Sequence, residues 1–431
     1  MKPSPLRSGY RIRRLAVALV GVTAAVSPVR ASPMADEIFE SYGGLVVQVR
    51  IIDRASGEKT AIGSGFFADP SGVLVTNYHV VADVVQHPDQ YVAELVDEEG
   101  GSAPLQLLNL DVVHDLAVLR SEESAEQSFE FATQSLAKGT RVFALGNPYD
   151  LGSSIVEGTY NGLLENSLYE KIHFTGAINA GMSGGPAVLG TGQVVGVNVS
   201  TSGDEVSFLV PAKYAARLVR ETRDPDFEPP EDFVDILRSQ LMENQQKLID
   251  RILGRDLDRI TLGEYRLPGK LAPFFHCWGS STRKKENPYE IVTHECSTQD
   301  EIFLDSEHSA GTIEFQHSLI SSTELSPLRF FSLYEANFAD ENAYVDGSTE
   351  QVSAFACTAD FVGHAQSNYK VAFCVRAYRK LPGLYDAVLK LASLNSNREG
   401  VQSTLLLSGI TFENAERFAR RYLESIAWRE P

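Results

Sequence analysis

Three residues stand in short, distinctive stretches whose combined chemistry would be acyl transfer. They are His79 in TNYHVV, Asp115 in DLAVLR and Ser183 in INAGMSGGPAV. A serine that transfers acyl groups needs an imidazole to take its proton and a carboxylate to orient that imidazole. We therefore expect His79 as general base, Asp115 as the orienting acid and Ser183 as nucleophile.

The glycines around Ser183 suit an oxyanion hole. With small residues on both sides, the backbone N–H groups of Gly181 and Ser183 can point into one space and hold a developing oxyanion. A tight glycine-rich turn without catalytic role is the alternative, because glycine and serine are both common in turns. The stretch alone leaves both interpretations open, and the other two triad candidates favour catalysis.

The elements that must position these residues are short strands. From about residue 38 to 219, strand-like runs such as GLVVQVRII, RVFALG and VSFLVP alternate with Gly, Asn, Asp and Pro, a pattern typical of an all-β sandwich or barrel. The stretch PAKYAARLVRE predicts a closing helix. The acidic, proline-rich stretch DPDFEPPED then predicts a linker.

A second region follows the linker. Apolar residues at helical spacing in FVDILRSQLMENQQKLIDRIL (Phe233, Leu237, Leu241, Leu248 and Ile252) predict an amphipathic helix docked on its own chain, with a coiled-coil dimer as the alternative. We assign residues 221–258 to the linker and this helix. Residues 259–431, with further strands and a closing helix FENAERFARRYLESIAW, are expected to form an α+β domain of unknown role.

All four cysteines lie in this second region, at Cys277, Cys296, Cys357 and Cys374. Each sequential pair flanks a polar turn between strand-like runs, so two hairpin disulfides, Cys277–Cys296 and Cys357–Cys374, are expected among the three possible connectivities. Four free buried thiols are the alternative. The sequence has neither a CxxC nor a CxxCH pattern, so neither a metal nor a cofactor is expected.

Residues 1–31 have the pattern of an export signal. A basic stretch precedes an apolar one, and Val29-Arg30-Ala31 fits a small-x-small cleavage site. An uncleaved anchor is the alternative, and no other stretch is apolar enough to span a membrane. We expect a bacterial periplasmic protein, with secretion as the second destination. The formal net charge of −19 makes nucleic acid and anionic membrane surfaces poor partners.

Six stretches in order carry a resemblance to the trypsin-like serine proteases, in particular the bacterial HtrA (Deg) branch. They are TNYHVV, DLAVLR, ALGNPYDLGSSIVEG, INAGMSGGPAV, VVGVN and SFLVPAKYAARLV, and the resemblance covers residues 37–220. It implies two six-stranded antiparallel barrels, with His79 and Asp115 from the first barrel and Ser183 from the second. It also implies an oxyanion hole at the backbone of Gly181 and Ser183.

The resemblance further implies a substrate pocket and decides between rival residues. Ala177 and Ile178 before the nucleophile and Val197-Asn198-Val199 after it would form the walls of the pocket. Without an acidic residue there, a small or medium aliphatic P1 residue is expected, because an unpaired charge is costly in an apolar pocket. Asp111 is an alternative for the orienting acid, but Asp115 in DLAVLR stands at the family's position for it. His114 is an alternative for the general base, but it is adjacent to Asp115, and adjacent residues of a strand face opposite ways.

Two departures limit what the resemblance implies. Position 182 is Met, where digestive members have Asp and HtrA proteases usually Asn, and nothing after residue 230 resembles a PDZ domain. The resulting hypothesis is an exported serine endopeptidase that acts on unfolded or extended polypeptides. The alternative is a catalytically silent, protease-like binding or scaffold protein. The sequence does not indicate an oligomeric state.

Overall fold

The computed structural model describes residues 34–201, 206–223, 227–282, 287–306, 308–340, 347–364 and 367–428. The expected export signal, residues 1–31, lies outside the described residues. The described residues from Met34 onward belong to one unit.

Two closed antiparallel barrels, each of six strands, make up the first half of the chain, as the family resemblance implies. In the first barrel the strand order is β1-β2-β3-β6-β5-β4, and in the second it is β10-β11-β12-β9-β8-β7. The strands of the first are β1 (Val46–Asp53), β2 (Lys59–Asp69), β3 (Val73–Thr76), β4 (Tyr91–Val96), β5 (Ser102–Asp111) and β6 (Leu116–Ser121). Those of the second are β7 (Thr140–Gly146), β8 (Ser154–Leu163), β9 (Ile172–Thr175), β10 (Pro186–Val188), β11 (Val194–Thr201) and β12 (Ser207–Pro211).

Short helices accompany the barrels, and apolar clusters fill and join them. The helices are α1 (Ala35–Tyr42), η1 (Gly43–Leu45), α2 (Tyr78–Gln86), η2 (Pro148–Asp150) and α3 (Ala212–Thr222). Alternating strand residues fill each interior, for example Val49 and Ile51 in the first barrel. A third cluster joins Phe66 of the first barrel to Phe143 of the second and to Leu218 of α3. The predicted helix over PAKYAARLVRE is thus confirmed, and its apolar residues pack in the cluster that joins the two barrels.

Helix α4 (Phe233–Leu253) confirms the predicted amphipathic helix. Asp232 caps it by accepting hydrogen bonds from the backbone N–H groups of Val234 and Asp235. Leu237 and Leu241 pack in a cluster with residues of the first barrel, whereas Leu248 packs in the core of the second half of the chain. The apolar face of α4 is therefore buried against its own chain.

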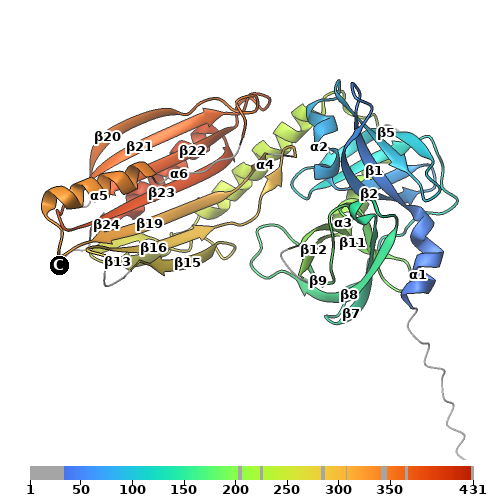
Figure 1. Ribbon diagram of the computed structural model, residues 1–431, viewed down its shortest axis with the longest axis horizontal. Helices are drawn as coiled ribbons and strands as arrows, with labels where there is room; N and C mark the ends of the chain where they lie inside the picture. The colour runs from blue at the N-terminus through green and yellow to red at the C-terminus, as the bar shows by residue number, and fades with distance from the viewer. Residues whose placement is uncertain are drawn as a thin grey trace, which may run out of the picture. The chain divides into compact units, whose positions relative to one another are not determined.

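The second half is built on a seven-stranded antiparallel sheet of order β15-β16-β19-β23-β22-β21-β20 (Figure 1). These strands are β15 (His276–Ser281), β16 (Glu290–Ser297), β19 (Ile313–Ser321), β20 (Ala356–His364), β21 (Ser367–Ala377), β22 (Tyr385–Ser393) and β23 (Glu399–Ile410). A three-stranded sheet contains β13 (Arg259–Leu262), β14 (Tyr265–Pro268) and β24 (Ala427–Trp428). A two-stranded sheet contains β17 (Ile302–Phe303) and β18 (Ser309–Ala310).

Helices cover both faces of this sheet. Helix α6 (Phe412–Ser425) packs on the face that includes Leu391, and α5 (Pro327–Asp340) packs on the face that includes Ala392. Neighbouring residues of one strand point to opposite faces, so the two helices lie on opposite sides. The combination of helices and sheet fits the expected α+β region; the domain boundary at residue 259 stays a prediction.

The two predicted disulfides are confirmed. Cys277 lies directly opposite Cys296 in the β15–β16 pair and is bonded to it, and Cys357 is bonded to Cys374 across β20 and β21. Cys277, His294 and Cys296 lie within reach of one another, but the two cysteines are oxidised and offer no thiolate to a metal.

Candidate active site

His79 lies in the first turn of helix α2, directly after strand β3. The stretch VLVTNYHVV predicts a strand end followed by a loop that presents His79 at the barrel rim, and this prediction is wrong because His79 lies on a helix. The run YHVVADVVQ continues as a helix because Tyr78, Ala82 and Val85 recur at helical spacing and are all buried. The consecutive valines of this run are typical of a strand, but its buried residues include three at the spacing of a helix.

Asp115 lies in the turn between β5 and β6 and holds His79 at two points. Its Oδ2 lies 2.7 Å from Nδ1 of His79, and its Oδ1 accepts a hydrogen bond from the backbone N–H of His79 at 2.9 Å. The turn gives Asp115 a φ of 54°, which Asp tolerates better than most residues. Asn77 supports it by donating from Nδ2 to the Asp115 carbonyl at 2.7 Å. With Nδ1 engaged, Nε2 is the ring nitrogen that can accept a proton.

The imidazole of His79 is largely buried, with 25% of the side chain exposed. Burial disfavours the imidazolium and by itself lowers the pKa of His79. The negative charge of Asp115 and its hydrogen bond act in the opposite direction and outweigh burial, so the pKa of His79 lies above its usual value of 6.5.

Ser183 lies in the loop between β9 and β10, and glycines shape this loop. Gly181 and Gly184 have φ values of 92° and 86°, which side-chain-bearing residues rarely adopt. A Cβ at Gly181 would lie 2.5 Å from the carbonyl oxygen of Asn147, and one at Gly184 would lie 2.2 Å from that of Ser64. Both positions therefore require glycine.

Strands of both barrels hold the Ser183 loop. Ser64 of β2 donates its backbone N–H to the carbonyl of Ser183 at 2.7 Å, and Gly184 donates its N–H to the carbonyl of Asn198 at 2.9 Å. Among the described residues, the N–H groups of Gly181 and Ser183 have no hydrogen-bond acceptor. Both N–H groups are therefore free to donate to another acceptor.

The hydroxyl of Ser183 is not directed at His79. Its Oγ donates to the carbonyl of Val199 at 2.9 Å, and within the described part of the chain no hydrogen bond joins it to His79. Such contacts often tighten only when substrate binds. Rotation about a single side-chain bond would redirect the hydroxyl.

Met182, the departure from the family pattern, packs in the core of the second barrel and has no exposed surface. The Nδ2 of Asn198 donates to the carbonyl of Leu145 at 2.9 Å and to that of Met182 at 3.3 Å. Burial of Met182 and the amide of Asn198 thus add to the contacts that hold the Ser183 loop, with no charge at position 182.

The expected pocket residues fall into two groups. Ala177 is exposed, and Ile178 is buried with 4% exposed. Val197 and Asn198 have no exposed surface: Val197 packs between the barrels and Asn198 holds the loop backbone. Val199, the next residue of β11, is partly exposed, and its carbonyl accepts the hydrogen bond of the Ser183 hydroxyl, so Val199 lies beside Ser183.

The rival residues Asp111 and His114 pair with each other instead of with His79. His114 Nδ1 lies 2.8 Å from Oδ2 of Asp111, and Arg217 of α3 donates to the same oxygen at 2.5 Å. The His114 ring stacks on Tyr214 with 3.7 Å between centroids. Asp111 is therefore committed to a separate ion-pair group.

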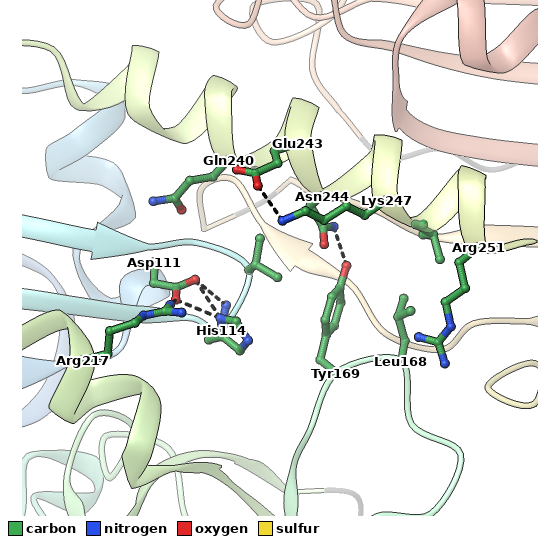
Figure 2. Close-up of a pocket in the computed structure, with 12 residues that line it drawn as sticks. Asp111, His114, Leu168, Tyr169, Arg217, Gln240, Glu243, Asn244, Lys247 and Arg251 are labelled. Carbon is green, nitrogen blue, oxygen red and sulfur yellow. Dashed lines mark hydrogen bonds and ion pairs between the residues drawn. The ribbon is translucent and has the colours of Figure 1, made fainter.

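Figure 2 shows this group at one end of a pocket of about 460 Å³ that extends along α4. Tyr169 lies in the middle of it and accepts a hydrogen bond from Asn244 of α4, while Lys247 pairs with Glu243. None of the three triad candidates lines this pocket.

Comparison with known proteins finds similarity in the first half of the chain. Residues 63–197 match the family model described as trypsin-like peptidase domain. This stretch is a trypsin-like peptidase domain. It includes His79, Asp115 and Ser183, and covers less than half of the chain.

Two curated relatives are named probable periplasmic serine endoprotease DegP-like. The one from Bartonella henselae is 35% identical over 37% of this chain and 33% of the relative, and the one from Chlamydia pneumoniae is 31% identical over 43% and 38%. The chain thus spans about a third of the length of these relatives. A crystal structure of the serine endoprotease from Yersinia pestis is 23% identical over 45% of this chain and 68% of that chain, with a TM-score of 0.39.

No helix in the described ranges combines the length and apolar character needed to cross a membrane.

Proposed function

We propose that this chain is a serine endopeptidase that uses His79, Asp115 and Ser183. The observation that supports it most is the double contact of the Asp115 carboxylate with His79, through Nδ1 and through the backbone N–H. This contact fixes both the ring orientation and the tautomer that a general base needs. The pairing of Asp111 with His114 and Arg217 leaves Asp115 as the acid.

The proposed reaction proceeds through an acyl-enzyme. Ser183 Oγ leaves the carbonyl of Val199 and attacks the scissile carbonyl carbon, while Nε2 of His79 takes its proton. The N–H groups of Gly181 and Ser183 stabilise the oxyanion. The imidazolium, stabilised by Asp115, then gives the proton to the leaving amine. Water attacks the acyl-enzyme by the same route and releases the second product.

We further propose that the substrate is an unfolded or extended polypeptide cleaved after a small or medium aliphatic residue. Ile178 packs in the apolar cluster that includes Met182, the carbonyl of Val199 binds the Ser183 hydroxyl, and neither residue carries a charge that could pair with a charged P1 side chain. Cleavage in the periplasm or outside the cell follows from the export signal expected in residues 1–31 and agrees with the names of the relatives.

A catalytically silent binding protein is the second candidate, favoured by the hydrogen bond from Ser183 to Val199 in place of His79. A serine-directed fluorophosphonate distinguishes the two. We expect the full chain to be labelled on the peptide that contains Ser183, and labelling to disappear in Ser183→Ala. The exposed Ser135→Ala is the matched control and should be labelled normally. Absence of label on the folded, unmutated chain would favour the binding protein.

A further inference from the structure

A short segment of the second half, residues 300–304, lies against the helix that carries His79. The carbonyl of Leu304 accepts hydrogen bonds from Oη of Tyr78 at 2.9 Å and from Nε2 of Gln86 at 3.2 Å. Tyr78 precedes His79 and is fully buried, in an apolar cluster that includes Ile302 and Leu304. The segment is therefore fixed to α2 by packing and by two side-chain hydrogen bonds.

The same segment is also bound to the second barrel. The carboxylate of Asp300 pairs with Nζ of Lys171 at 2.6 Å and accepts a hydrogen bond from the backbone N–H of Leu168 at 3.0 Å. Only 7% of Asp300 is exposed, so solvent screens this ion pair weakly. Residues 300–304 thus connect one barrel to the other on the side of His79.

Phe303 is the member of this segment that meets the imidazole. Its ring centroid lies 5.2 Å from that of His79, with 53° between the ring planes. Ile302 and Leu304 are buried in this apolar cluster, whereas Phe303 packs against it and is only partly buried. The ring therefore covers part of the imidazole and keeps a surface that a bound chain can contact.

We propose that Phe303 is a specificity-determining residue, forming an apolar wall of the subsite that adjoins His79. This inference rests on the proposed function and extends it, because the second half of the chain then supplies part of the substrate-binding cleft. The substrate residue that lies over His79 would be apolar. A charged residue there would lose its hydration against Phe303 without gaining a partner.

Fluorogenic peptides that differ only at the residue over His79 test this proposal. For the full chain we expect kcat/KM to favour Leu over Asp and Lys at that position. Phe303→Ala should reduce this preference on the order of tenfold, mainly through KM, and Phe303→Leu should restore most of it. The fluorophosphonate labelling rate should not change, since Phe303 does not act in the chemical step.

The matched control is Phe361→Ala on β20, because Phe361 is 70% exposed and lies in the edge strand of the large sheet. It should keep the unmutated preference. An unchanged preference in a folded, labelled Phe303→Ala would overturn the proposal. Phe303→Ala could instead cleave every peptide faster by the same factor and be labelled faster by the fluorophosphonate. That result would also overturn the proposal, since it would mean that Phe303 blocks the site and does not select the substrate. An unmutated chain that neither labels nor cleaves would instead overturn the proposed function itself.

Discussion

Asp115 contacts His79 with both carboxylate oxygens. Oδ2 lies 2.7 Å from the ring nitrogen Nδ1, and Oδ1 accepts a hydrogen bond from the backbone N–H at 2.9 Å. The backbone contact places the start of helix α2, and the ring contact selects the tautomer. The position and the tautomer of His79, the proposed general base, therefore depend on a single carboxylate.

Replacing that carboxylate should disable catalysis while keeping the geometry. We expect Asp115→Asn to lower kcat on the order of 10³- to 10⁴-fold, because the amide cannot stabilise the imidazolium and favours the wrong tautomer. Steady-state kinetics with an unfolded protein substrate measure the change. Asp111→Asn is the control: it disturbs the ion pairs with His114 and Arg217 and should leave kcat nearly unchanged.

The pH dependence of kcat/KM should report the raised pKa of His79. Activity requires neutral imidazole, so the rate should fall as the pH drops through a value above the usual 6.5. In Asp115→Asn the charge that raises this pKa is lost, burial remains, and the residual activity should extend to lower pH. A rate that stays flat between about pH 5 and 8 would argue against His79 as the general base.

Stability of the second half should fall on acidification because of His317. This residue is fully buried, its Nε2 lies 2.9 Å from the carbonyl of Pro268, and burial lowers its pKa to about 3. Between about pH 3 and 6.5 the unfolded chain binds the extra proton, so stability is lost as the pH falls through this window.

Unfolding by urea at several pH values checks this effect. In His317→Gln the slope of the free energy of unfolding against pH should be smaller by up to about 1.4 kcal/mol per pH unit. The exposed His276→Gln should keep the full slope. Identical slopes in both variants would mean that His317 does not cause the acid sensitivity.

The disulfides should stabilise the second half without affecting the triad. Each closes a short loop, with sequence separations of 19 and 17 residues, for which chain entropy predicts about 3 kcal/mol. We expect a Cys277→Ser/Cys296→Ser variant to unfold at lower denaturant concentration and still to be labelled by a fluorophosphonate. Loss of labelling while α4 and the barrels stay folded would show that the bridge also supports the site.

Local patterns were enough for much of the fold. The hairpin symmetry about two polar turns predicted both disulfide pairs, and the heptad-like spacing in residues 233–253 predicted α4. Strand-like runs with turn residues predicted an all-β first half, while the closure into two barrels came from the family resemblance. The helix that carries His79 was missed, because GVLVTNYHVV has strand propensity and only the tertiary burial of Tyr78 and Val85 shows a helix.

Contacts between residues far apart in the chain could not be predicted from the sequence. Val197 and Asn198 look like pocket walls by position, but both are fully buried, Val197 in the cluster between the barrels and Asn198 as a donor to the loop backbone, and Val199 is the partly exposed neighbour of Ser183. Nothing in the stretch EIFLDS indicates that Phe303 meets an imidazole more than two hundred residues earlier, because that contact depends on how the second half packs on α2.

Hydrolysis of unfolded casein by the purified chain and by Ser183→Ala is the most direct test of the account. Removing Oγ deletes the nucleophile from a partly exposed loop position and creates no core cavity, so the variant should fold. The account predicts a loss of turnover on the order of 10³-fold or more in Ser183→Ala, with the melting temperature unchanged. Equal turnover by the two proteins would contradict it.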